Sequence, residues 1–68
     1  MSQQSKFGIY LNVKEKKVRR VNSPYGIPPA SDKNWVYLTP EVNMTLLNIR
    51  KLAGEKKLVD KPDSVAWE

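Results

Sequence analysis

Apolar and polar side chains alternate through residues 7 to 13, which is the spacing of a strand with one buried face. The apolar positions of this segment are Phe7, Ile9, Leu11 and Val13. Residues 17 to 21 predict a second, more polar strand. The segment between the two strands lacks the Asn-Gly or Asp-Gly of a tight hairpin turn, so we expect a four-residue loop. Such a loop pairs Val13 with Val18 and Tyr10 with Val21.

The spacing of apolar residues changes after residue 40 to that of an amphipathic helix. The apolar face of the predicted helix consists of Val42, Thr45, Leu46, Ile49, Leu52 and Ala53. Thr39 can accept hydrogen bonds from the first free amides of a helix, and Pro40 suits the first helical position. Glu41 is favoured beside the positive end of the helix dipole, and Gly54 is a natural stop. We therefore expect one helix over about residues 40–53, with Thr39 as its N-cap.

Residues 22 to 34, called the proline segment below, contain three of the five prolines of the chain and exclude a helix or a central strand. Two interpretations of this segment are open. In the first, its stiff backbone carries Tyr25 and Ile27 back over the sheet, and proline lowers the entropy lost on folding. In the second, both side chains stay exposed on an extended segment that docks a partner. The small size of the domain favours the first interpretation, because few residues are available for a core.

The order of elements indicates a small α+β protein. A short aromatic and β-branched run at residues 35–38 predicts a third strand, and the tail after residue 58 offers either a C-terminal strand or a dimer contact. We expect a single domain over residues 1–68, with residues 1–5 as a disordered tail. Its small antiparallel sheet contains the N-terminal hairpin and the strand near 35–38. The helix over about residues 40–53 packs on one face of this sheet.

The composition excludes several classes of functional site. The 68 residues include neither cysteine nor histidine, so disulfides and zinc, copper or haem sites are not expected. The commonest general base and the best nucleophile are therefore missing, and the three glycines are too far apart for a phosphate loop. Asp60 and Asp63 are the nearest carboxylate pair, but acidic residues around a proline more often form turns. We expect a non-catalytic protein without metal, cofactor or small-molecule substrate.

The hydropathy of the chain gives no sign of a membrane protein. No apolar run approaches the roughly 20 residues of a membrane span, and the first five residues are polar. We therefore expect a soluble cytoplasmic protein without a membrane partner, and the lack of cysteine is compatible with a reducing compartment. A core this small gains stability from association, which favours a protein partner or a homodimer.

The net charge of +5 resides entirely in the first 20 residues, which hold six basic residues and one acidic residue. A cationic hairpin with an aromatic ring beside it can contact phosphates and stack on a base. The candidate nucleic-acid-binding residues are Tyr10, Lys14, Lys16, Lys17 and Arg19. Lysines at hairpin tips and strand edges more often serve to prevent aggregation, so nucleic-acid binding is the alternative hypothesis.

Two apolar residues, Met44 and Leu47, fall outside the apolar face of the predicted helix and need a second cover or stay exposed. Methionine is common at adaptable binding surfaces. The candidate protein-binding residues are Tyr25, Ile27, Met44, Leu47 and Trp67. The leading hypothesis is therefore a small soluble interaction module that binds a protein partner or itself.

Overall fold

The computed structural model describes residues 6–29 and 31–68. Its strands are β1 (Gly8–Asn12), β2 (Lys17–Val21), β3 (Trp35–Thr39) and β4 (Ala66–Trp67). The α-helix α1 spans Leu46–Glu55, and two short 3-10 helices, η1 and η2, span Pro24–Gly26 and Pro62–Ser64. Residues 1–5, which we expect to form a disordered tail, lie outside the described residues.

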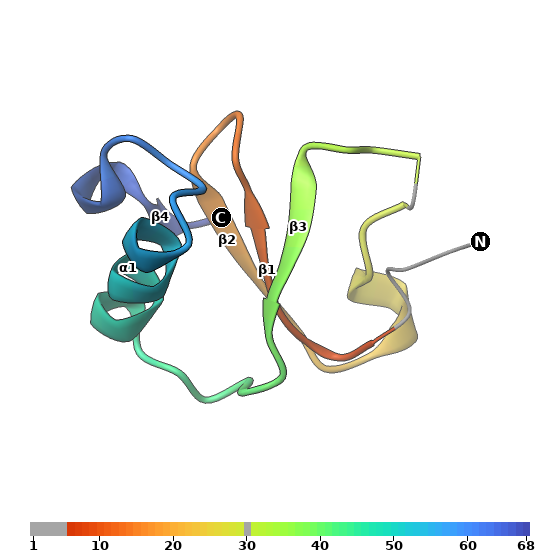
Figure 1. Ribbon diagram of the computed structural model, residues 1–68. Helices are drawn as coiled ribbons and strands as arrows, with labels where there is room; N and C mark the ends of the chain where they lie inside the picture. Colours follow the sequence, from red (N-terminus) through yellow and green to blue (C-terminus); the bar gives the residue numbers. More distant parts are fainter. Residues whose placement is uncertain (1–5, 30) are drawn as a thin grey trace.

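The strands of the described chain form one sheet in the order β3-β1-β2-β4 (Figure 1). β1 pairs antiparallel with both β2 and β3, and α1 packs on one face, which confirms the predicted α+β architecture. The expected C-terminal strand is present as β4, but it runs parallel to β2, so the sheet is mixed rather than purely antiparallel. Between β2 and β4 the chain crosses through β3 and α1, and a crossover connection of that kind permits two strands to run in the same direction.

The hairpin register differs by two residues from the predicted one. Leu11 pairs with Val18 and Tyr10 pairs with Arg19, whereas the sequence pattern paired Val13 with Val18. A shift of two residues preserves the face on which each side chain lies. The alternation of apolar and polar residues in the sequence of β1 therefore predicted the face on which each side chain lies, but not its partner in β2.

The side chain of Asn12 explains why β1 ends one residue early. Its Oδ1 accepts hydrogen bonds from the backbone N–H groups of Lys14 (3.0 Å) and Glu15 (2.9 Å). These bonds turn the chain out of the sheet before Val13 can pair with β2. Lys16 closes the four-residue loop with a left-handed backbone, at a φ of 59°.

An irregularity in the pairing of β1 with β3 lets residues from both strands reach the helix face. Ile9 pairs with Thr39 and Tyr10 pairs with Tyr37, so Leu38 is an extra residue in β3, as in a β-bulge. Gly8 lies beside this bulge with a φ of +149°, and a Cβ at this position would collide with the carbonyl oxygen of Thr39. The bulge therefore requires glycine at position 8.

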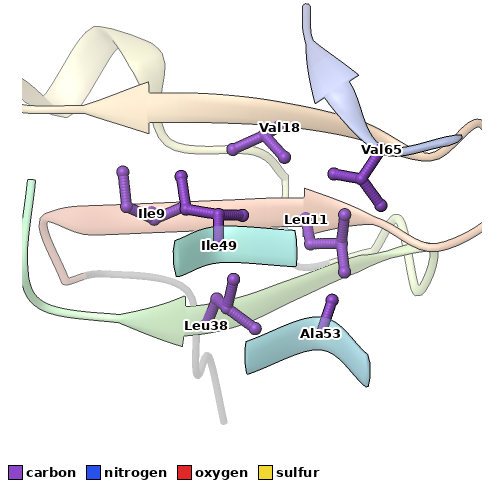
Figure 2. Close-up of a cluster of buried hydrophobic side chains, with 7 residues drawn as sticks. All are labelled: Ile9, Leu11, Val18, Leu38, Ile49, Ala53 and Val65. Atoms are coloured by element: carbon purple, nitrogen blue, oxygen red, sulfur yellow. The ribbon is translucent and has the colours of Figure 1, made fainter. Parts of the chain in front are cut away.

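Two apolar clusters lie on opposite faces of the sheet. The first is packed beneath α1 (Figure 2) and consists of Ile9, Leu11, Val18, Leu38, Ile49, Ala53 and Val65. The second lies on the face that carries the proline segment and consists of the buried residues Tyr10, Val21 and Trp35. Neither face of the central strand β1 is open to solvent, since all five of its residues are buried. The interior is thus divided by the sheet into a helix side and a proline-segment side.

The helix begins six residues later than predicted, and its N-cap is Thr45 rather than Thr39. The Oγ1 of Thr45 accepts a hydrogen bond from the backbone N–H of Asn48 at 3.4 Å. Thr39 instead ends β3, and its Oγ1 accepts from the N–H of Glu41 at 3.3 Å in a local turn. Both threonines are competent caps, and the difference arises because the chain must first pass from the edge strand β3 to the helix face. Met44 therefore belongs to the connecting loop and not to the helix.

The C-terminal end of α1 and one predicted core residue also differ from expectation. Gly54 lies within the helix, which continues to Glu55 before Lys57 adopts a left-handed φ of 57°. The N–H of Leu58 then donates to the carbonyl of Ala53 at 3.0 Å, as in a Schellman cap. Phe7, predicted as part of the core, is 47% exposed because β1 begins only at Gly8.

Candidate interaction surfaces

The proline segment lies across the second face of the sheet, on the side away from α1 (Figure 1). Ile27 packs against the buried cluster there, and Pro28 is fully buried. Tyr25, in contrast, is 97% exposed at the turn formed by η1. The interpretation that this segment carries both side chains back over the sheet is thus confirmed for Ile27 and wrong for Tyr25. Ile27 is correspondingly less accessible as a protein-binding residue, whereas Tyr25 is fully accessible.

Tyr10 cannot stack on a base, so this part of the predicted nucleic-acid site is wrong. Its side chain is fully buried beneath the proline segment, and its hydroxyl donates a hydrogen bond to the carbonyl of Lys6 at 2.6 Å. The ring also meets that of Tyr37 edge to face, at 5.2 Å between centroids. Burial raises the pKa of the Tyr10 phenol above its ordinary value. The sequence pattern wrongly predicted an exposed ring because Tyr10 lies among the polar positions of the alternation in β1. Both faces of β1 are in fact covered.

Arg19 is a structural residue rather than a free phosphate-binding cation. Its Nε and Nη2 donate to the two side-chain oxygens of Glu68 at 2.7 Å each, and its Nη1 donates to the carbonyl of Gly26 at 3.1 Å. The guanidinium also lies over the ring of Trp35, at 4.6 Å from the centroid. Hydrogen bonding between the two side chains raises the pKa of Arg19 and lowers that of Glu68. The carboxylate of Glu68 therefore already compensates the charge of Arg19 within the protein.

The three lysines of the predicted basic hairpin lie at its tip and at the start of β2. Lys14 and Lys17 are exposed, and Lys16 is partly buried. The Nζ of Lys16 lies 3.6 Å from a side-chain oxygen of Asp60, in the loop that follows α1. That ion pair brings the hairpin tip beside a segment more than forty residues away in the sequence, where further lysines follow α1.

Two of the candidate protein-binding residues are partly used within the fold. Met44 packs against the cluster beneath α1 from the loop that precedes the helix. Trp67 packs against the same cluster from β4, and the guanidinium of Arg20 lies 4.5 Å from its ring centroid. Met44 and Trp67 thus both contribute to the core, so neither side chain is fully available to a partner.

Leu47 remains as the exposed apolar residue of the helix. Its side chain is 68% exposed in the first turn of α1. Beside it, a groove of about 200 Å³ runs between α1 and η2 and is lined by Leu47, Arg50, Lys51, Gly54, Pro62 and Asp63. We call this the α1–η2 groove. A Cβ at Gly54 would lie 3.0 Å from Cγ of Pro62, so glycine allows η2 to approach the helix closely.

Arg50 fixes the position of η2 relative to the helix. Its Nε donates a hydrogen bond to the carbonyl of Val65 at 2.9 Å, at the junction between η2 and β4.

The groove residues 47, 50, 51 and 54 were not recognised as a set from the sequence. Their spacing places them on one face of a helix, which is the signal that was available. Pro62 had no such signal, because its contact with the helix depends on the path of the tail.

The described residues offer little that resembles a catalytic or metal centre. A second hollow, of about 360 Å³, is lined only by the consecutive residues Pro40, Glu41, Val42 and Asn43 of one loop, so groups from different elements do not converge on it. Within residues 6–29 and 31–68 there is no group of three acidic side chains placed to hold a metal ion. The helix found in this part of the chain is also too short to cross a bilayer.

Comparison with protein-family models, with curated proteins and with solved structures gave no match for this chain. The assignment of function therefore depends on the surfaces described above.

Proposed function

We propose that the protein is a small non-catalytic interaction module of the cytoplasm that binds a protein partner, or a second copy of itself, through the α1–η2 groove. The exposure of Leu47 beside this groove is the observation that carries the proposal. The lack of histidine and cysteine supports a binding role over a catalytic one.

The position of Leu47 is unusual for a domain with so small an interior. A leucine side chain contributes roughly 1.5–3 kcal/mol when it is buried, so an exposed leucine beside a groove represents binding energy that the isolated fold does not use. Two other large apolar side chains are exposed among the described residues. Phe7 directly precedes β1, and Tyr25 lies in η1. Leu47 differs from them because it has an adjoining concave surface.

The dimensions and lining of the groove favour a side chain of a partner protein as its occupant. A volume of about 200 Å³ lies below the roughly 300–1,000 Å³ of pockets that hold small molecules. Leu47 and Pro62 provide apolar contact, while Arg50, Lys51 and Asp63 supply charged groups at the margins. An apolar anchor surrounded by polar groups is the usual arrangement at the centre of a protein interface.

Leu47→Ser tests the proposal, with Tyr25→Ser as the matched control on the opposite side of the sheet. Each variant removes one exposed apolar side chain, so we expect little change in folding stability from either. Partners captured from nuclease-treated host lysate by the wild-type protein are expected to be lost with Leu47→Ser and kept with Tyr25→Ser. Loss with Tyr25→Ser alone would move the interface to the proline segment and contradict the proposal.

Sedimentation at several protein concentrations distinguishes a second copy from a different partner. If the occupant is another copy of the chain, the wild-type protein shifts from monomer to dimer with concentration and Leu47→Ser stays monomeric. Apolar docking of either kind predicts an affinity with little dependence on salt, in contrast to binding by lysines. A dimer that is unaffected by Leu47→Ser would exclude self-association through this groove.

A further inference from the structure

Lysines from two distant segments meet at one end of the molecule. The β1–β2 hairpin contributes Lys14, Lys16 and Lys17, and the connection from α1 to η2 contributes Lys56, Lys57 and Lys61. We call these six lysines the basic end. In Figure 1 the tip of the hairpin and the loop after α1 lie side by side at the same end of the sheet. The ion pair of 3.6 Å between Lys16 and Asp60 and the hydrogen bond of 3.1 Å from Ala66 N–H to the carbonyl of Lys16 establish that proximity.

The lysines of the two segments are close enough for their positive charges to add to one another in solution. Lys61 follows Asp60 directly, and Lys57 lies three positions before Asp60, a reach of at most about 10 Å even in an extended chain. This is similar to the Debye length of about 8–10 Å at physiological salt. The two segments contain the carboxylates Glu15 and Asp60, and Glu55 adjoins them at the end of α1, so the carboxylates are half as many as the lysines. A surplus of positive charge therefore remains after every possible internal pairing.

We propose that the basic end binds the phosphate backbone of nucleic acid. Five of its lysines are exposed and the sixth, Lys16, is held by Asp60. Lysine ammonium groups are strongly hydrated point charges that bind phosphates without reading bases. This site differs from the hairpin site expected from sequence, because Tyr10 and Arg19 are absent from it and the lysines after α1 are added.

The surroundings of the basic end favour nucleic acid over a lipid surface. Membrane-binding basic segments usually combine their cations with apolar side chains that enter the bilayer interface. The apolar side chain exposed on α1 is Leu47, which lies nine residues before Lys56, about 14 Å along the helix axis. The aromatic ring beside the basic end is Trp67 of β4, the strand paired with β2, and it already packs against the cluster beneath α1 and contacts the guanidinium of Arg20. Because this ring is engaged within the fold, base stacking and bilayer insertion both lack a freely exposed side chain here, which favours contact with phosphates.

The test measures binding of fluorescein-labelled duplex DNA, duplex RNA and single-stranded DNA by anisotropy over a series of salt concentrations. Neutralising four to five phosphates predicts a plot of log K against log salt with a slope of about −4 for duplex DNA. Lys14→Gln with Lys17→Gln, and separately Lys56→Gln with Lys61→Gln, should each reduce the magnitude of the slope by about 2. Each pair should also weaken binding by at least about 10-fold near 0.1 M salt. Lys6→Gln with Lys51→Gln is the charge-matched control, whose slope should remain that of the wild-type protein.

Three results would overturn the proposal. A slope unchanged by Lys56→Gln with Lys61→Gln would show that the two segments do not form one site. A preference for single strands over both duplexes by more than about 10-fold would indicate base stacking instead of backbone contact. Binding to vesicles rich in phosphatidylserine, with none to any of the nucleic acids, would assign the lysines to a membrane surface. Thermal melting of every variant confirms that each remains folded, since all of these side chains lie on the surface or in solvent-facing turns.

Discussion

The guanidinium of Arg19 and the side-chain carboxylate of Glu68 share two hydrogen bonds of 2.7 Å across 49 positions of sequence. The same guanidinium lies over Trp35 and donates to the carbonyl of Gly26. This one side chain therefore connects β2, the proline segment, β3 and the chain that follows β4. Such a junction makes the pair a measurable part of the stability of the fold, although the pair itself is partly open to solvent.

Replacing Glu68 with Gln should lower the free energy of unfolding by about 0.5–1 kcal/mol at neutral pH, since both side chains are partly exposed and solvent weakens their attraction. The folded-state pKa of Glu68 is lowered by its hydrogen bonds to Arg19. Its contribution is thus complete above the unfolded-chain pKa of about 4.3 and is lost as the pH falls through the folded-state pKa. Urea denaturation of both proteins at several pH values measures the difference, which should disappear in acid. Glu15→Gln, at the exposed hairpin tip, is the control, and an equal effect from it would refute the prediction.

Replacing Tyr10 with Phe should cost about 1 kcal/mol, because the carbonyl of Lys6 loses its buried donor. Burial raises the phenol pKa in the folded state, so the stability due to Tyr10 is complete below the unfolded-chain value of about 10 and falls as the pH rises towards the folded-state value. Denaturation in alkaline buffers should therefore show a steeper loss for the wild-type protein than for Tyr10→Phe. Tyr25→Phe, at a residue that is 97% exposed, is expected to behave like the wild-type protein.

Replacing Gly8 with Ala should destabilise the protein by at least about 2 kcal/mol. The added methyl group would collide with the carbonyl oxygen of Thr39 and with Cα of Pro40, and the backbone φ of +149° is itself unfavourable for alanine. Thermal and urea denaturation measure the loss. Gly26→Ala supplies the comparison, since its new Cβ would meet only Val21 at ordinary contact distances of 3.7 and 3.8 Å. Similar stabilities for the two variants would mean that the bulge in β3 adapts to a side chain at position 8.

Replacing Thr45 with Ala should cost about 1 kcal/mol and expose the first turn of α1. The amide of Asn48 loses the hydroxyl acceptor that it contacts at 3.4 Å, so its hydrogen exchange should accelerate. Thr39→Ala should instead affect the amide of Glu41 and leave the helix unchanged. Thr45→Ser, which keeps the hydroxyl, should restore slow exchange at Asn48. Faster exchange at Asn48 in Thr39→Ala would place the N-cap at the position expected from the sequence.

The parts of the fold that depend on local spacing could be predicted from the sequence. The alternation around Ile9 and Leu11 identified β1 and the side chains that face the helix, and the apolar spacing that includes Ile49 and Ala53 identified the helix. The start of the helix was less predictable, because the sequence offers two threonines as possible N-caps. Thr39 and Thr45 both can cap a helix, and only the path from the edge strand to the helix face decides between them.

The parts that depend on contacts between distant residues could not be predicted. Nothing near Arg19 in the sequence indicates that Glu68 will neutralise it, or that Trp35 will lie beneath it. Tyr10 has the spacing of an exposed strand residue, and its burial follows from the path of the proline segment, whose described residues before β3 include a short 3-10 helix but no strand or α-helix. The exposure of Leu47 was one of the two alternatives that the sequence left open, because it depends on position around a single helix, and its role in binding stays a prediction.

The parallel pairing of β4 with β2 also determines the order in which the chain can reach its native state. A hairpin such as β1–β2 forms within about 1–10 μs, whereas distant segments meet only after the entropy of a long loop has been overcome. β4 therefore docks late, and until then the edge of β2 is open to strands of other nascent or unfolded chains. The positive charges of Lys17, Arg19 and Arg20 along that edge repel like copies during this interval. We therefore expect the basic residues of β2 to oppose aggregation of the folding chain until Glu68 has docked and neutralises Arg19.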